Sequence, residues 1–129
     1  MVTDPFQIKD LPEVYPIVEP FIERLYRSFG GYSPQETYEL LEMRAATLHL
    51  VGDEGFFIAQ WMPGVCHVLA AHSFNGRASD LSEIISSTVS YAKKYHCSKI
   101  TFTSPREGWK KVAIRNGFHV ETITYAKDI

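Results

Sequence analysis

Val65-Cys-His-Val-Leu-Ala-Ala-His72 is an uncharged, apolar run of strand length near the middle of the chain. The elements that follow it indicate the class of fold. We predict a polar turn over 73–80, a capped helix from Leu81 to about Tyr95, a strand over 99–103, a basic helix around 109–115 and a last strand over 118–125. Strands that alternate with helices of this length predict a sheet covered by helices.

The N-terminal half adds two predicted helices and a meander. Asp10-Leu-Pro-Glu13 is a capping box that starts an apolar helical stripe, which Pro16 and Pro20 are expected to kink or shorten before Gly30-Gly31 ends it. Ser33-Pro-Gln-Glu36 starts a second helix, ending near Arg44 or Ala45. Three strands joined by tight turns follow, over 47–51, 56–62 and from 65 onward. The predicted order is ααβββαβαβ.

Bulk properties limit the protein class. The chain of 129 residues, 45% of them hydrophobic, is predicted to form a single domain over residues 1–129. No apolar run approaches membrane-spanning length and no signal peptide is recognisable, so we expect a cytoplasmic protein without a membrane partner. Cys66 and Cys97 are interpreted as buried thiols of a reducing compartment. The histidines show no metal-ligand spacing, so no metal site is expected.

Charge is distributed unevenly. Residues 1–64 hold four Lys/Arg and ten Asp/Glu, whereas residues 65–129 hold nine and five. The basic half suits phosphates on a nucleotide-like cofactor or on nucleic acid, and it is equally consistent with a solvated face balanced by the acidic half. The sequence leaves the oligomeric state open.

The order of elements, together with Ala113-Ile-Arg-Asn-Gly-Phe118 at the junction of the last helix and strand, resembles the GCN5-related N-acetyltransferase (GNAT) superfamily. The resemblance implies an α/β (α+β) domain with a mixed central sheet and helices on both faces. Tyr32-Ser33-Pro-Gln-Glu36 and Arg106-Glu-Gly-Trp109 are similar to features of the small GNAT-like proteins of phages and prophages. A phage origin would place the protein in the host cytoplasm or in a virion.

The resemblance implies acetyl-CoA or another acyl-CoA as cofactor, held by the loop after the central strand. The corresponding residues are Ser73, Asn75, Gly76, Arg77, Ala78 and Ser79. Helix N-termini favour phosphate. The loop departs from the family's glycine spacing, and Asp80-Leu-Ser-Glu83 reads as a capping box that puts negative charge near the phosphate position. Ala113 occupies the position of a tyrosine acid in many family members.

Two residues are candidates for catalysis. His72, at the loop end of the central strand, could deprotonate an attacking amine, or it could be a hydrogen-bonded histidine at a sheet end. Tyr125, on the predicted last strand, is the alternative acid. His67 lies five residues from His72, so strand alternation places them on opposite faces. Cys97 lacks the partners of an acyl-accepting nucleophile beyond the neighbouring His96.

Substrate-binding candidates follow the strand over 99–103. Ser104, Arg106 and Trp109 lie where ligands gather in α/β folds, with Arg106 suited to an anion and Trp109 to a flat group. The alternative interpretation is a helix cap with Trp109 packed inward.

Two functions remain open on the sequence. The first is an acyl-CoA-dependent N-acyltransferase, phage or prophage encoded, acting on an amine of a small molecule or of a nucleobase in nucleic acid. The second is a GNAT-fold structural or interaction protein without activity. Fold resemblance cannot separate them.

Overall fold

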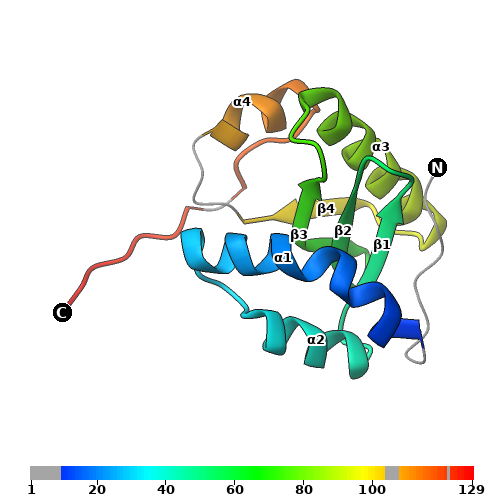
Figure 1. The fold of residues 1–129 in the computed structure, drawn as a ribbon. Helices are drawn as coiled ribbons and strands as arrows, with labels where there is room; N and C mark the ends of the chain where they lie inside the picture. The colour runs from blue at the N-terminus through cyan, green and yellow to red at the C-terminus, as the bar shows by residue number, and fades with distance from the viewer. Residues whose placement is uncertain (1–9, 104–107, 122) are drawn as a thin grey trace.

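The computed structural model describes residues 10–103, 108–121 and 123–129. Their order along the chain is two helices, three strands, a helix, a strand and a helix (Figure 1). The elements are α1 (Leu11–Phe29), α2 (Pro34–Glu42), β1 (Thr47–Val51), β2 (Gly55–Met62), β3 (Val65–Ser73), α3 (Ala78–Lys94), β4 (Lys99–Phe102) and α4 (Gly108–Arg115). No helix of this described part is both long and apolar enough to span a membrane.

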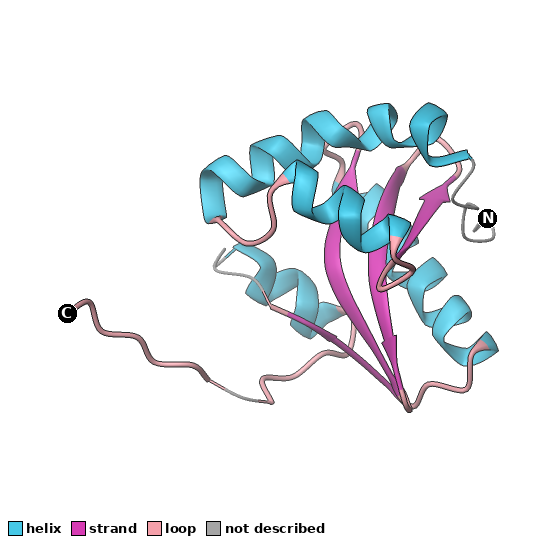
Figure 2. Cartoon of the chain, turned by 90° about the horizontal axis from the view of Figure 1, so that it is seen from below, coloured by secondary structure: helices cyan, strands magenta, loops and turns pink. Residues whose placement is uncertain are grey.

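A mixed four-stranded sheet forms the centre of the molecule, with strands in the order β1-β2-β3-β4. The first three strands are antiparallel and β4 runs parallel to β3. Helices α1 and α2 lie on one face, and α3 and α4 lie on the other (Figures 1 and 2). The predicted mixed sheet with helices on both faces is therefore confirmed.

The alternating side chains of β2 hold both layers to the sheet. Phe56 and Ile58 are fully buried in the core beneath α1 and α2, whereas Phe57 and Ala59 are buried in the core beneath α3. This alternation follows from the period of two in a strand. A strand buried on both faces explains why 56–62 reads as a nearly continuous apolar run.

The helix starts illustrate what local sequence determines. The predicted capping box of α2 is present, because Glu36 N–H donates to Ser33 Oγ at 3.1 Å and Ser33 N–H donates to Glu36 Oε1 at 3.0 Å. The expected short first turn of α1 is wrong, since one helix runs from Leu11 to Phe29 through Pro16 and Pro20. Both prolines are exposed, so water can reach the carbonyl groups that each proline leaves without a helical donor.

Two predicted elements in the C-terminal half are also wrong. The described residues of 118–125, all but 122, form no strand. Lys99 on β4 pairs with Glu121 and the Phe102 and Phe118 rings pack edge to face, so this segment contacts β4 through side chains. The observed order is thus ααβββαβα. Helix α3 begins at Ala78, three residues before the predicted Leu81.

The sheet departs from regularity at β3. Ile58 pairs with Ala70 and Ala59 pairs with Val68, so Leu69 is an extra residue in a β-bulge. Pairing with β4 runs only from Val65↔Lys99 to Val68↔Phe102. Beyond Val68 the two strands separate, and Figure 1 shows β4 pointing in a different direction from β3. The bulge and the separation coincide.

The two cysteines differ in burial, and both are free thiols. Burial raises the pKa of the Cys66 thiol to about 12, with a smaller contribution from the nearby Cys97. The thiolate is the reactive form. We therefore expect a thiol reagent at pH 8 to label half-buried Cys97 in the native protein and Cys66 only after unfolding. Rapid labelling of a native Cys97→Ser variant would contradict this burial.

Candidate active site

A pocket of about 370 Å³ lies where β3 and β4 separate. Its floor consists of β3 residues 67–71 and of Ile100, Phe102 and Thr103. One side is lined by α1 and the connection to α2, and the other by α3, Ala113 and Phe118. Because residues from both faces of the sheet line it, the pocket passes between the two strands.

Small residues and the end of strand pairing keep this space open. Ala70 and Ala71 project little from β3, and Gly30 and Gly31 have φ angles of 77° and 87° with nothing within 4 Å of a Cβ built on either. Positive φ is the region in which glycine is favoured. Larger side chains at these positions would enter the pocket or strain the connection between α1 and α2.

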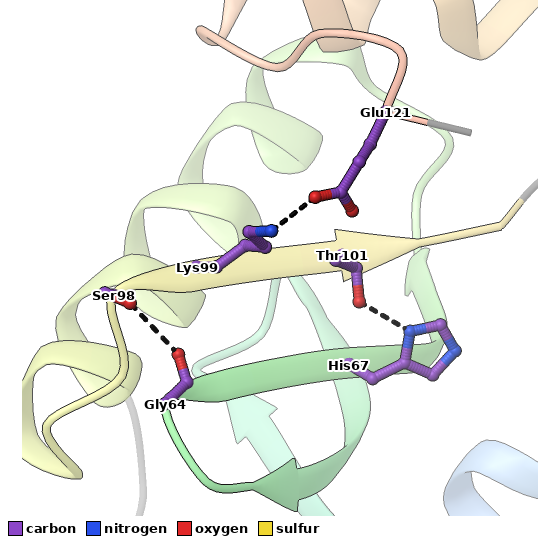
Figure 3. A network of polar contacts seen from close by, with 6 residues as sticks. All are labelled: Gly64, His67, Ser98, Lys99, Thr101 and Glu121. Carbon is purple, nitrogen blue, oxygen red and sulfur yellow. Dashed lines mark hydrogen bonds and ion pairs between the residues drawn. The ribbon is translucent and has the colours of Figure 1, made fainter.

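His67 lies one residue before the end of the β3–β4 pairing and lines the pocket. Its Nδ1 lies 2.7 Å from Oγ1 of Thr101, its partner across the parallel pair. Figure 3 shows this bond between the strands, with the second ring nitrogen turned away from β4. When Nδ1 donates to Thr101, Nε2 is the unprotonated nitrogen and can accept a proton. The arrangement therefore orients a potential base at the pocket.

The bulge changes which face each histidine occupies. Cys66 and Val68 pack with α3, so His67 between them faces α1. After the extra residue the alternation is inverted: Ala71 packs with α3, and His72 contacts Phe21 of α1 at a ring-centroid distance of 5.0 Å. The prediction that His67 and His72 point to opposite faces is wrong for this reason.

His72 itself is tied to the end of the strand. Its Nδ1 donates to the carbonyl oxygen of Ser73 at 2.6 Å, and its ring packs on Phe21. His72 is not among the described residues that line the pocket. The geometry matches the alternative interpretation of a hydrogen-bonded histidine at a sheet end, and the catalytic role of His72 stays a prediction.

The loop between β3 and α3 turns around a buried serine. Ser73 Oγ donates to Asp80 Oδ2 at 3.0 Å and accepts the Asn75 N–H at 3.2 Å. Asp80 is only 7% exposed and lies inside the first turn of α3, while Arg77 is the N-cap. The predicted Asp80–Glu83 capping box is therefore wrong. Asp80 still places a negative charge in the first turn of α3, with its carboxylate directed to Ser73, whereas Glu83 lies beyond that turn.

The start of α3 fits a phosphate-bearing group. Asn75, Gly76, Arg77 and Ser79 are exposed there, and Gly76 has a φ of 70°. The first N–H groups of a helix lack intrahelical acceptors and carry partial positive charge. Arg77 adds a formal charge beside them. Of the residues predicted for cofactor binding, Ser73 is buried, and it shapes the loop.

The other predicted site residues differ in whether they lie near the pocket and in whether the structure describes them. Ser104 and Arg106 lie outside the described residues, and Trp109 lies in the first turn of α4. Tyr125 is 88% exposed on the C-terminal segment, which extends away from the sheet in Figure 1. Ala113 does line the pocket, as the resemblance implies for its position. The described residues contain no cluster suited to a metal ion.

Tyr26 and Tyr32 line the pocket from the α1 side and were not predicted from sequence. Tyr26 lies outside the apolar stripe predicted for the first helix, and Tyr32 belongs to the predicted start of the second helix. A weak signal was present in the Gly30-Gly31 pair between them, because two glycines permit close approach of a ligand. His67 was missed because the bulge is invisible in the sequence.

The sequence matches no protein-family model and no curated protein. Solved structures are similar over almost the whole chain. A probable acetyltransferase superposes with a TM-score of 0.68 at 15% identity, covering 100% of this chain and 97% of that one. An aminoglycoside acetyltransferase from an uncultured soil sample, in complex with sisomicin, gives 0.67 at 10% identity, covering 99% and 96%.

A third similar structure is a ribosomal-protein-alanine N-acetyltransferase from Brucella melitensis biovar Abortus. It superposes with a TM-score of 0.64 at 18% identity and covers 99% of each chain. Sequence identities this low indicate a shared fold, but they do not indicate a shared substrate. Together with the sheet that separates between β3 and β4, these likenesses show that the chain has the GNAT fold, that of the GCN5-related N-acetyltransferases.

Proposed function

We propose that the protein is an acyl-CoA-dependent N-acyltransferase that acts on the amine of a small molecule. The observation that carries this proposal is the pocket that opens between β3 and β4 beside His67. A passage through the sheet lets two substrates meet end to end, one from each face. Proximity of this kind is the main requirement of acyl transfer to an amine.

The acyl donor enters from the face that carries α3. The exposed residues Gly76, Arg77 and Ser79 would hold its phosphates, because the helix start favours anions there. When bound, acyl-CoA supplies a thioester whose acyl carbon accepts the amine and whose thiolate leaves. Within the described residues, the pairing of β3 with β4 ends at Val68, and backbone N–H groups of Leu69–Ala71 would hold the carbonyl oxygen of the donor.

The acceptor enters from the face that carries α1. His67 Nε2 accepts a proton from the amine as nitrogen attacks, and Thr101 keeps the imidazole in position through Nδ1. The leaving thiolate takes up one proton, so the products are an amide and a thiol. No hydroxyl at position 113 assists this step, and the reaction depends on positioning and on deprotonation of the amine.

A second candidate is a GNAT-fold interaction protein without activity. One observation favours it: Ala113 lines the pocket at the position where the resemblance implies a tyrosine acid. Phage origin and action on a nucleobase remain predictions of the sequence, as does the place of the protein in the cell.

Calorimetric titration with acetyl-CoA at low salt tests the proposal against this alternative. We expect micromolar binding by the wild-type protein and about three- to tenfold weaker binding by Arg77→Ala, because a solvent-exposed charge contact contributes about 1 kcal/mol. Lys127→Ala is the matched control, since it removes one exposed positive charge from the C-terminal segment. Absence of binding at millimolar acetyl-CoA would overturn the proposal in favour of the non-catalytic role.

A further inference from the structure

We infer that the acceptor is a monoamine carried on an aromatic, otherwise uncharged body, and that the site rejects polycationic amines. This inference rests on the proposed function and concerns the part of the pocket between α1, α2 and β3.

The acceptor side of the pocket is apolar and uncharged. Its lining consists of Ile22, Leu25, Tyr26, Tyr32, Thr37 and Leu69, together with the two glycines at 30 and 31. No aspartate, glutamate, lysine or arginine occurs among the described residues that line any part of the pocket. A buried ammonium group requires a paired charge or several hydrogen bonds. A polyamine would lose its hydration here without finding a carboxylate.

The nearest charged residues of α1 are directed to one another and to the helix surface. Glu23 pairs with Arg27, and the Arg24 guanidinium lies over the Phe21 ring at 4.7 Å while its Nε donates to the Pro20 carbonyl. Helical spacing places 22, 25 and 26 toward the pocket and 23, 24 and 27 away from it. The carboxylate of Glu23 is thus unsuited to neutralise a cation in the pocket.

Two tyrosines offer aromatic surface at the entrance. Tyr26 is 40% exposed and Tyr32 is 46% exposed, and within the described part of the chain neither ring packs against another ring. Most other aromatic side chains near the sheet belong to stacked or edge-to-face pairs, as Tyr15 does with Tyr38. Exposed rings beside a pocket provide stacking surface for a flat ligand. The glycine pair between them leaves space for such a ring to enter.

The chemistry of the attacking nitrogen agrees with this assignment. An amine attacks only in its unprotonated form, and an apolar surrounding favours that form over the ammonium. Aryl amines are weak bases and arrive unprotonated at neutral pH. An arylalkyl amine must first release its ammonium proton to solvent, and His67 then takes the second proton as the nitrogen attacks. A polyamine or an aminoglycoside carries further charges that remain in the pocket.

A panel of acceptors with acetyl-CoA tests the inference through the release of coenzyme A thiol. The probes are 4-methoxyaniline and phenethylamine against spermidine and kanamycin. We expect kcat/KM for the aromatic amines to exceed that for the polycations by at least about 100-fold. Equal rates, or preference for the polycations, would overturn the inference while leaving the acyltransferase proposal intact.

Variants of the two rings provide the second readout. Tyr26→Ala and Tyr32→Ala are expected to raise KM for phenethylamine about two- to tenfold each, as the loss of one aromatic contact predicts, while Tyr32→Phe keeps it. Tyr95→Ala is the matched control, because Tyr95 is 49% exposed and packs with Trp61 and Tyr91 away from the pocket. Unchanged KM in both alanine variants would contradict the assignment of these rings.

Measuring acetyl-CoA binding distinguishes failure of the acceptor assignment from failure of the proposed acyltransferase function. Binding of acetyl-CoA without acylation of any aromatic amine overturns the acceptor class alone. Absence of acetyl-CoA binding overturns the proposed function and the acceptor class together. Calorimetry of phenethylamine with the CoA-saturated protein adds a readout that does not require turnover, and we expect binding there that kanamycin does not share.

Discussion

Replacement of His67 with asparagine is expected to lower kcat for amine acylation by about 10²- to 10⁴-fold, the range that a positioned general base contributes. The reason is that His67 lines the pocket where β3 and β4 separate, with Nδ1 held by Thr101 at 2.7 Å. Steady-state kinetics over pH 6–9 is the measurement.

Two further variants distinguish catalysis from structure. His72→Asn is expected to affect the rate less than His67→Asn, because His72 lies outside the described pocket lining and donates to the Ser73 carbonyl. Thr101→Ser keeps the hydroxyl and should retain activity, whereas Thr101→Val should lower kcat without unfolding the protein. A larger loss in His72→Asn than in His67→Asn would support the sequence-based prediction and contradict the present assignment.

Gly55→Ala is expected to produce the largest loss of stability among single small substitutions, about 3 kcal/mol in the free energy of unfolding. A Cβ at this position would lie 2.2 Å from the His72 carbonyl oxygen and 2.5 Å from Cδ1 of Ile84. The carbonyl belongs to the paired β3 backbone, where Gly55 faces Ser73, so it cannot move aside cheaply. Urea unfolding should show a lower midpoint with an unchanged slope.

Gly31→Ala is the control for this stability measurement. A Cβ there meets nothing within 4 Å, so only the positive φ of 87° opposes the substitution, at about 1–2 kcal/mol. If Gly55→Ala were less destabilising than Gly31→Ala, the close approach of β2, β3 and α3 described above would be wrong.

The sequence predicted those elements whose signals are local. The Ser33–Glu36 capping box lies within four residues, and the observed hydrogen bonds reproduce it. The two-sided burial of β2 follows from an apolar run bounded by glycine and proline turns, and it made a sheet with helices on both faces predictable. The last helix and its Gly117-Phe118 junction indicate the fold class from the sequence.

Features that depend on contacts between distant segments were not predictable in the same way. The bulge at Leu69 depends on the pairing of β2 with β3. Because of this extra residue, His67 and His72 lie on the same face of the sheet, whereas regular strand alternation predicts opposite faces. Residues 118–125 have strand-like alternation, yet their described part forms no strand and contacts β4 through the Lys99–Glu121 pair and the Phe102 and Phe118 rings. The sequence predicts Asp80 as a helix cap, but its carboxylate instead accepts a buried hydrogen bond from Ser73.

Backbone amide shifts measured by NMR during titration with acetyl-CoA would locate the donor site most directly. We predict shift changes at Leu69–Ala71, beyond the described β3–β4 pairing, and at Gly76–Ser79, at the start of α3, with little change at Thr47–Val51 on the far edge of the sheet. Changes confined to β1 and α2, or no changes at saturating ligand, would contradict an acyl-CoA site between β3 and β4.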